Sequence, residues 1–241
     1  MATASDNKQL AIFIEQILNS GFYRSRLATK PLDLEHYITL LFRDLHFKDK
    51  NVLDIGGGIG LFSFCAPFLG AKKVVCLEPE AFGSSSGMID TFNNLKRLLN
   101  CTNVQLENSR FQEFKTKAEN YDIILLHNSI NHLNEKACQT LLYDRDSFAL
   151  YEQIFRKLFL ISKKNAKLII CDCSRYNFFH FLKIKNPFAP TIEWNKHQAP
   201  ETWARLLMNN GFKNPRIRWL SFKQLRSAGQ ILFGNKVIDI C

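Results

Sequence analysis

Two stretches near the start of the chain have apolar residues at the spacing of an amphipathic helix. Residues 8–20 read "KQLAIFIEQILNS", and residues 32–45 read "LDLEHYITLLFRDL". In both, apolar side chains recur three or four positions apart, so they would share one face of a helix. Asn19, Ser20 and Gly21 would end the first helix, and Pro31 would open the second. The pattern predicts a helical N-terminal part over residues 1–46.

From residue 51 the pattern changes to short apolar runs that alternate with helical stretches. Strands are predicted at 51–55, 73–80, 103–108, 121–128 and 166–173, and helices at 61–71, 87–99, within 134–160 and at 200–210. Pro67 lies late in the 61–71 stretch and predicts an early end or a kink of that helix. Two further apolar runs, at 215–222 and 230–240, would be closing strands. This alternation is typical of an α/β fold with a doubly wound, mostly parallel sheet.

The seven cysteines do not follow the pattern of a disulfide framework. Their number is odd, and several lie in apolar runs such as "VVCL" and "LIICDC". That usage favours a reducing compartment. The sequence contains no C-x-x-C pair, which would be the signal of a zinc site. The N-terminus lacks the features of a secretory signal, and no window approaches about 18 uncharged apolar residues. We therefore expect a cytoplasmic protein without a membrane span or a metal ion.

The positive charge is concentrated in the last two-fifths of the chain. Residues 1–149 carry 16 Lys and Arg against 17 Asp and Glu, whereas residues 150–241 carry 16 against 5. This imbalance would suit an acidic partner or substrate, nucleic acid included. The charges are spread out, however, so a solvated exterior of helices and edge strands explains them as well.

The most informative motif follows the first predicted strand. The segment "VLDIGGGIG" at 52–60 places Asp54 at the strand end and glycines at alternate positions. Glycine accepts positive φ and lets a ligand approach the backbone, although a tight buried turn would select it too. Position 61 is Leu, so the dinucleotide fingerprint G-x-G-x-x-G is absent, and no G-x-x-x-x-G-K-[ST] phosphate loop occurs. Glu78 ends the next strand, where a carboxylate can bind both ribose hydroxyls, so the pair favours a nucleoside ligand.

Five segments, in order along the chain, resemble those of the class I S-adenosylmethionine-dependent methyltransferases. They are "VLDIGGGIG" at 52–60, "VVCLEPE" at 74–80, "NSRFQEF" at 108–114, "YDIILLHNSINHL" at 121–133 and "NAKLIICD" at 165–172. The resemblance implies a seven-stranded sheet of the class I methyltransferase type. It also implies S-adenosyl-L-methionine as the cofactor and S-adenosyl-L-homocysteine as the product.

The same resemblance implies a set of cofactor-binding residues. The 56–60 loop would lie under the methionine part of the cofactor, Glu78 would hold the ribose, and residues 109–111 would lie beside the adenine. Ser109 stands where many family members have Asp, which leaves the contact to the adenine amino group open. The implied set is Asp54, Gly56, Gly57, Gly58, Gly60, Glu78, Pro79, Ser109, Arg110, Phe111, His127 and Asn128.

Residues 127–132, "HNSINH", follow the fourth predicted strand. The two histidines are five positions apart, which is off one helical face, and no acidic cluster accompanies them, so they do not indicate a metal site. Methyl transfer needs positioning, and a base when the nucleophile carries a proton. Histidine titrates near neutral pH, so His132 is the candidate base. A His132 that only caps the next helix or packs on its own loop remains the alternative, and His127 would be a cofactor-side or structural residue.

The segment 173–200 is long and aromatic for a connector and could form a lid over an acceptor pocket. The same aromatic residues could instead only cover the sheet. Its basic residues, Arg175, Lys183, Lys185 and Lys196, would favour an acidic acceptor. The candidate substrate residues are Tyr23, Tyr37, Asn131, Tyr176, Trp194 and His197.

The sequence thus predicts one methyltransferase domain over residues 1–241. Its parts would be a helical cap at 1–46, a cofactor-binding core at 47–172, a lid-like insert at 173–200 and a C-terminal helix with strands at 201–241. The predicted reaction is methylation of a small molecule at O or N. RNA or protein methylation by the basic C-terminal third is the alternative, as is a non-catalytic homologue that binds the cofactor or a partner. The absence of [DN]-P-P-[YFW] and of a Pro-Cys pair disfavours nucleic acid, and the oligomeric state is not indicated.

Overall fold

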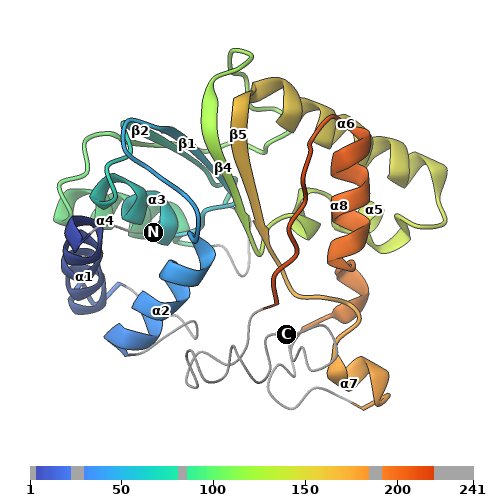
Figure 1. The fold of residues 1–241 in the computed structure, drawn as a ribbon, viewed down its shortest axis with the longest axis horizontal. Coiled ribbons are helices and arrows are strands. Elements are labelled where there is room, and N and C mark those ends of the chain that lie inside the picture. Colours follow the sequence, from blue (N-terminus) through green and yellow to red (C-terminus); the bar gives the residue numbers. More distant parts are fainter. Residues whose placement is uncertain (1–3, 23–29, 81–85, 185–191, 220–241) are drawn as a thin grey trace. The chain divides into compact units, whose positions relative to one another are not determined.

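The computed structural model describes residues 4–22, 30–80, 86–184 and 192–219 (Figure 1). The chain divides into two compact units. The first unit comprises Met1–Ser129 and Ile161–Cys171, and the second comprises Ile130–Leu160 and Asp172–Cys241. Tyr23 and the predicted strand at 230–240 lie outside the described residues.

The first unit is built on a five-stranded, all-parallel sheet. Its strands are β1 (Asn51–Ile55), β2 (Lys73–Leu77), β3 (Val104–Glu107), β4 (Tyr121–His127) and β5 (Ser162–Cys171). They lie in the order β3-β2-β1-β4-β5. The central strands are apolar and almost wholly buried, as expected where both faces of a parallel sheet are covered. The strand order reverses between β1 and β4, and at such a point a ligand crevice forms at the carboxyl ends of the strands.

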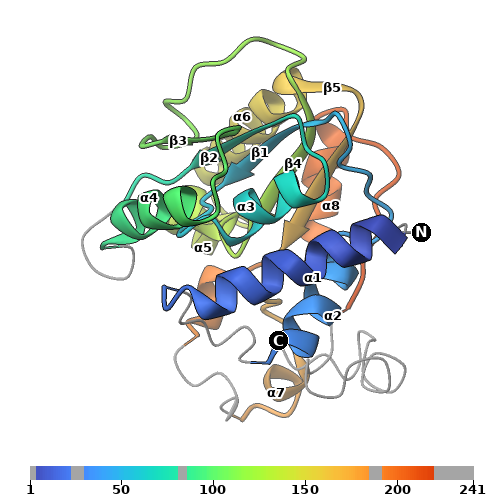
Figure 2. The same ribbon diagram turned by 90° about the vertical axis from the view of Figure 1, so that its left-hand side faces the viewer.

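Four helices belong to the same unit (Figure 2). They are α1 (Ala4–Asn19), α2 (Pro31–Leu41), α3 (Leu61–Phe68) and α4 (Met88–Leu98). Helix α3 packs on β1, β2 and β3, and α1 packs on α2 and α3. Aromatic rings fill the contacts: Phe13 of α1 lies 5.3 Å from Phe68, and Phe64 of α3 lies 4.6 Å from Phe92 of α4. The helical N-terminal part is therefore joined to the sheet through an aromatic core.

The second unit is helical in the residues that the structure describes. Its elements are η1 (Asn131–Leu133), α5 (Glu135–Thr140), α6 (Arg145–Ile161), α7 (Phe178–Phe181), η2 (Trp194–Lys196) and α8 (Pro200–Asn209). Its core joins α6 to α8, because the rings of Tyr151 and Phe155 lie 5.2 and 5.9 Å from that of Trp203. Tyr151 is fully buried, so its hydroxyl needs a partner inside the protein.

The predicted α/β class with a parallel sheet is confirmed, with five strands rather than seven in the described residues. The prediction of a strand at 215–222 is wrong for residues 215–219, which form no strand. The single helix expected within 134–160 is interrupted at residues 141–144. There the Asp144 carboxylate accepts hydrogen bonds from the N–H and hydroxyl of Ser147, at 2.9 and 2.6 Å, and so caps a new helix.

The early end predicted at Pro67 is confirmed, because α3 stops at Phe68. Proline has no N–H to continue the helical hydrogen bonds. Gly70, at φ +92°, then donates its N–H to the Pro67 carbonyl at 2.9 Å and turns the chain toward β2.

Two glycines that precede helices provide a matched test of packing. Gly60 before α3 and Gly87 before α4 have φ of +84° and +78°, so alanine at either site is strained by about 1–2 kcal/mol. A Cβ at Gly60 would also lie 2.6 Å from the Phe92 ring, whereas no atom of the described residues lies within 4 Å of one at Gly87. We expect Gly60→Ala to lower the free energy of unfolding by about 1–3 kcal/mol more than Gly87→Ala, measured by urea denaturation. Equal losses would contradict the packing described.

Candidate functional site

The carboxyl ends of β1 and β4 meet directly at the point where the strand order reverses. The Ser129 hydroxyl, just past β4, donates a hydrogen bond to the Ile55 carbonyl of β1. A Cβ at Gly56 would lie 2.6 Å from the Ser129 Cβ, so only glycine fits there. The glycine loop turns back on β2, because the Gly56 N–H donates to the Leu77 carbonyl at 2.8 Å. The loop after β1 is thereby fixed beside both neighbouring strands.

The glycines of this loop differ in what surrounds them. A Cβ at Gly57 would lie 2.5 Å from Cys76 Sγ and 2.7 Å from Asp54 Oδ2, so Gly57 is required by packing. Gly58, at φ +56°, has only Met88 Sδ within 4 Å of that position in the described part of the chain. The backbone at Gly58 is therefore the place where a ligand can approach closely.

Asp54 is a buried carboxylate at the end of β1, with an exposed fraction of 1%. Its Oδ2 accepts a hydrogen bond from Ser63 at 2.7 Å, whereas its Oδ1 is buried without a partner among the described residues. The pKa of Asp54 is raised to about 6, chiefly by burial; the hydrogen bond from Ser63 opposes this rise, and the charge of Glu78 adds to it. The unpaired oxygen can accept a hydrogen bond from a ligand.

Glu78 lies directly after β2 and is bound to the glycine loop. Its Oε2 accepts the Gly58 N–H at 2.8 Å, and its side chain is mostly buried. Burial raises the pKa of Glu78, and the hydrogen bond from Gly58 opposes that rise. The carboxylate predicted to hold a ribose thus lies next to the most open glycine of the loop.

Glu80 has a structural role two residues later. Its carboxylate accepts the N–H groups of Gly87 and Ile89 at 2.9 and 2.8 Å, at the start of α4. These hydrogen bonds, that from Ile89 first, lower the pKa of Glu80. Pro79, between the two carboxylates, is exposed.

The predicted adenine-side residues follow β3, whose end pairs with that of β2. The Glu78 N–H donates to the Glu107 carbonyl at 3.2 Å, which brings the Ser109 segment to the same edge as Glu78. Ser109 Oγ is buried and has no partner in the described part of the chain. Phe111 is buried and Arg110 is exposed. The hydroxyl of Ser109 can therefore serve a ligand.

His127, at the end of β4, forms a short hydrogen bond with Tyr37 of α2. The Tyr37 hydroxyl lies 2.6 Å from His127 Nε2 and 3.4 Å from Cys171 Sγ at the end of β5. The His127 ring also lies 4.6 Å from that of Phe62. Asn128 follows with φ +51° and an exposed side chain. The fold thus brings one predicted acceptor residue and one predicted cofactor residue together in the first unit.

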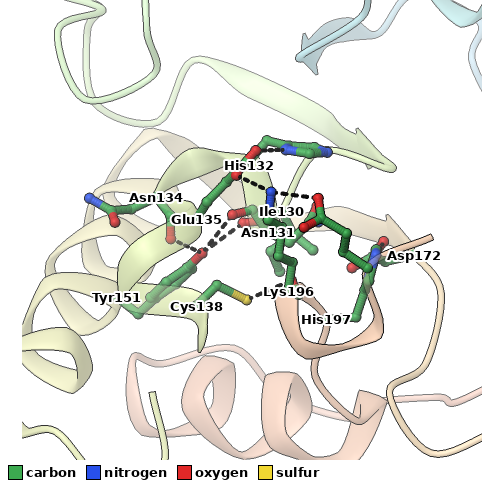
Figure 3. Close-up of polar contacts among 11 residues, drawn as sticks. Ile130, Asn131, His132, Asn134, Glu135, Cys138, Tyr151, Asp172, Lys196 and His197 are labelled. Atoms are coloured by element: carbon green, nitrogen blue, oxygen red, sulfur yellow. Dashed lines mark hydrogen bonds and ion pairs between the residues drawn. The ribbon is translucent and has the colours of Figure 1, made fainter. Parts of the chain in front are cut away.

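His132 belongs to the second unit and lies at one end of a row of polar side chains (Figure 3). Its Nδ1 lies 2.7 Å from Glu135 Oε1, and Glu135 Oε2 lies 3.0 Å from Lys196 Nζ. Lys196 also pairs with Glu193 at 2.7 Å. The hydrogen bonds from Lys196 and then His132 lower the pKa of Glu135, so this carboxylate stays ionised beside the histidine. The His132 side chain is 56% exposed and open to an acceptor.

The other predicted acceptor residues of the second unit have different surroundings. Asn131 is buried, and its Oδ1 has no partner among the described residues. His197 Nδ1 lies 3.1 Å from Asp172 Oδ1, and the Trp194 ring lies 6.2 Å from that of His197. Tyr176 is exposed, with its ring edge-on to His180. The sequence placed Tyr176, Trp194 and His197 in the 173–200 segment and Asn131 in the loop after the fourth strand, but it did not show which of them are buried.

Several contributing residues were missed by sequence reasoning. Ser63 and Ser129 are short polar residues whose partners, Asp54 and Ile55, lie on other elements. Glu135 could have been found from the sequence, because it lies three positions after His132 and residues three apart on a helical turn are neighbours. Within the described ranges, no group of three His, Cys, Asp or Glu could hold a metal ion, and no helix is long and apolar enough to cross a membrane.

Comparisons with known proteins agree with this geometry. The sequence matches a family model described as a methyltransferase domain over residues 23–232. Protein arginine N-methyltransferase 1 of Caenorhabditis elegans is 33% identical over 90 residues, 37% of this chain and 25% of that protein. Ribosomal protein L11 methyltransferase of Prochlorococcus marinus is 34% identical over 82 residues, 33% of this chain and 26% of that protein. The chain spans about a quarter of the length of these curated relatives.

A solved structure shares the fold over most of its length. A SAM-dependent methyltransferase from Aquifex aeolicus superposes with a TM-score of 0.57 at 16% identity, covering 85% of this chain and 91% of that one. At this identity the likeness shows the fold alone, and it agrees with the predicted α/β class. The predicted family is confirmed by the match over residues 23–232. The predicted cofactor, S-adenosylmethionine, is also the cofactor named for the Aquifex aeolicus methyltransferase.

The buried Asp54 predicts how stability depends on pH without a ligand. Below about pH 4 the carboxyl is protonated in both the folded and the unfolded chain. As the pH rises toward 6, the unfolded chain releases this proton while the folded chain retains it, because the folded pKa is about 6 against 3.8. The free energy of unfolding should therefore fall across this range, by on the order of 3 kcal/mol, and level off above it.

Asp54→Asn should remove most of this slope, measured as urea midpoints across the same pH range. Asp49→Asn is the matched control, since Asp49 is exposed and asparagine tolerates its φ of +62°. Parallel profiles for the wild-type protein and Asp54→Asn would contradict the assignment of the slope to Asp54.

Proposed function

Because the chain belongs to the methyltransferase domain family, we propose that it transfers a methyl group from S-adenosylmethionine to O or N of a small-molecule acceptor. The observation that supports this most strongly is the edge formed by the ends of β1, β2, β3 and β4. It combines an open glycine backbone, a carboxylate after the second strand and two unpaired buried oxygens. The cofactor would supply a methyl group activated on a sulfonium, and the reaction would be an in-line displacement.

The residues of the first unit fit the cofactor that the sequence predicts. Gly58 leaves space at the backbone, and Glu78 beside it can accept the two ribose hydroxyls. Asp54 Oδ1 and Ser109 Oγ are the buried atoms of this unit without a partner in the described residues. A buried polar atom without a partner is costly, so these two favour a ligand that completes their hydrogen bonds. S-adenosylmethionine offers two groups that can form such hydrogen bonds, the amino group of its methionine part and the edge of its adenine.

Calorimetry with S-adenosylmethionine and S-adenosylhomocysteine tests the cofactor assignment. We expect both to bind the wild-type protein and Glu78→Gln to weaken both by roughly tenfold or more, because hydrogen bonds to a charged group are lost. The glutamine oxygen can still accept the Gly58 N–H, so the loop should keep its form.

Glu107→Gln is the control for this experiment, since Glu107 is an exposed carboxylate at the end of the neighbouring strand. It should bind both compounds like the wild-type protein. A folded protein that binds neither compound would contradict the proposed function.

His132 is the proposed base for acceptors that carry a proton on the nucleophile. Glu135 accepts a hydrogen bond from Nδ1, which leaves the lone pair on Nε2. Lys196 holds the other oxygen of Glu135 and keeps the carboxylate in place. The exposed ring can then receive a proton from an acceptor, which is the geometry that general-base catalysis requires.

His132→Gln should lower kcat by roughly a hundredfold or more, the usual contribution of a general base, with cofactor affinity unchanged. Glu135→Gln should lower kcat less, because the base is retained and only its orientation is weakened. Turnover of labelled cofactor and calorimetry measure the two effects. His46→Gln, a change of an exposed histidine in the first unit, is the control. A kcat of His132→Gln equal to that of the wild-type protein would exclude His132 as the base.

One alternative acceptor class is supported by charge. The last two-fifths of the chain has 16 basic against 5 acidic residues, which would suit RNA or an acidic protein. Turnover against separate metabolite, RNA and protein extracts distinguishes these classes, and methylation only of RNA or protein would replace the small-molecule assignment. Cofactor binding without turnover on any extract would support a non-catalytic homologue.

The location and the domain organisation are also proposals. The six described cysteines are all free, which suits the cytoplasm. We propose that residues 1–241 form one methyltransferase domain. The proposed acceptor-side residues that the structure describes are Tyr37 of the first unit and Asn131, His132, Tyr176, Trp194 and His197 of the second unit.

A further inference from the structure

Unpaired buried polar atoms are concentrated in the second unit. In the described residues, seven buried side-chain N or O atoms have no hydrogen-bond partner. Two of them, on Asp54 and Ser109, belong to the first unit and are assigned above to the cofactor. The other five are Asn131 Oδ1, Asp172 Oδ2, Arg175 Nε, Gln198 Oε1 and Trp203 Nε1. Native proteins pair nearly all such groups, so five in one unit call for an explanation.

Three of these five residues contact Tyr151 or Cys138 directly, and Figure 3 shows two of the five, Asn131 and Asp172, together with Tyr151 and Cys138. The Tyr151 hydroxyl lies 3.0 Å from the Ile130 carbonyl oxygen and 3.4 Å from that of Asn131. The Cys138 carbonyl accepts a hydrogen bond from Gln198 Nε2, and the Trp203 ring packs on Tyr151 at 5.2 Å. Asn131 and Trp203 are therefore neighbours of the Tyr151 side chain, and Gln198 is a neighbour of the Cys138 backbone.

Asp172 and Arg175 are close to Cys138 as well. The pKa of the Cys138 thiol is raised to about 12, chiefly by burial; the hydrogen bond with Tyr151 opposes this rise, and Asp172 and Arg175 have smaller effects of opposite sign. The Asp172 side chain is 5% exposed, and His197 occupies its Oδ1 at 3.1 Å. Arg175 uses Nη2 to bind the Asn195 carbonyl, and its Nε is left over.

The unpaired atoms divide by chemistry into two groups. Asn131, Asp172 and Gln198 offer three oxygens that accept hydrogen bonds. The orientation of the Gln198 amide is fixed, because its nitrogen donates to the Cys138 carbonyl, so its unpaired atom is an oxygen. Arg175 and Trp203 offer two N–H donors. An ammonium group has three N–H donors, and a carboxylate is an acceptor for the two remaining donors.

We propose that the second unit has a binding site for a small zwitterion that carries an ammonium group and a carboxylate. The ammonium group is bound by the free oxygens of Asn131, Asp172 and Gln198. The carboxylate is bound by Arg175 Nε and Trp203 Nε1. His197 lies 3.1 Å from the other oxygen of Asp172, so the unpaired Oδ2 is the oxygen that the ammonium group binds. Asn131 is also assigned above to the methyl acceptor. The proposal goes beyond that assignment, because it concerns binding that is measurable without a methyl donor.

Calorimetry and thermal denaturation of the full chain, without S-adenosylmethionine, test this site. The probes are glycine, β-alanine and γ-aminobutyrate, which separate the two charged groups by increasing lengths. At least one should bind saturably and raise the Tm. Methylamine and acetate, which carry one charged group each, should bind at least about tenfold more weakly than that probe.

Two variants separate binding from structure. Asn131→Leu removes an oxygen that has no partner, so the Tm of the unliganded protein should stay the same or rise, while zwitterion affinity falls at least about tenfold. Asp172→Asn removes the charge and should lower affinity by more than that. Asp146→Asn, the same change at an exposed residue of α6, should bind the zwitterion like the wild-type protein.

The outcomes are separable from those of the proposed function. S-adenosylhomocysteine should bind all three variants with unchanged affinity, because its residues lie in the first unit. If none of the three zwitterions binds the folded protein, ordered water completes these hydrogen bonds and the site proposal is overturned. Equal zwitterion affinity of wild-type protein and Asn131→Leu would overturn it too.

Discussion

The burial of the Asp54 carboxylate at the end of β1 governs the geometry of the first unit's site. Ser63 of α3 donates to one of its oxygens, so the carboxylate links the strand to the helix that follows the glycine loop. Gly57 has no room for a Cβ because Asp54 and Cys76 fill that position. The loop must therefore pass close over the strand ends, where the Gly58 N–H reaches Glu78. A buried charge is costly, and its second oxygen is not compensated by any described residue.

This arrangement combines rigid packing with unpaired polar groups at one edge of the sheet. A larger side chain does not fit at three glycines of the loop. A Cβ at Gly56, Gly57 or Gly60 would collide with Ser129, Asp54 or the Phe92 ring, respectively. These glycines hold the loop in place rather than make space for a ligand. Gly58 is the open position, and the unpaired oxygens of Asp54 and Ser109 belong to the same unit. Proteins tolerate such unfavourable groups chiefly at functional sites, where a ligand completes them.

The second unit also combines a well-packed core with unpaired polar groups. Its aromatic core of Tyr151, Phe155 and Trp203 is well packed, yet polar groups at its margin lack partners. By contrast, His132 Nδ1, Glu135 and Lys196 are paired with one another in a partly exposed row. An exposed ion pair contributes little to stability, so the row is better explained by orientation of the histidine than by support of the fold. Each unit thus carries its own set of buried polar atoms without a partner among the described residues.

The sequence by itself determined the features that depend on local spacing. Apolar runs of strand length fixed β1 to β5, and the glycines with Glu78 after neighbouring strands indicated the nucleoside site. The break at Asp144 was not predicted, because it depends on a side chain that caps a new helix. The absence of a strand at 215–219 was not predicted either, because strand propensity depends strongly on tertiary context.

Tertiary structure alone decided which residues meet. Tyr37 and His127 are 90 positions apart, and Asp172 and His197 are 25 apart, so no periodicity relates them. Nor could the sequence separate the open Gly58 from the packed glycines beside it, because that difference depends on atoms from Cys76, Phe92 and Ser129. Periodicity reports which face of an element is apolar, whereas a site is made by side chains that folding brings together from distant parts of the chain.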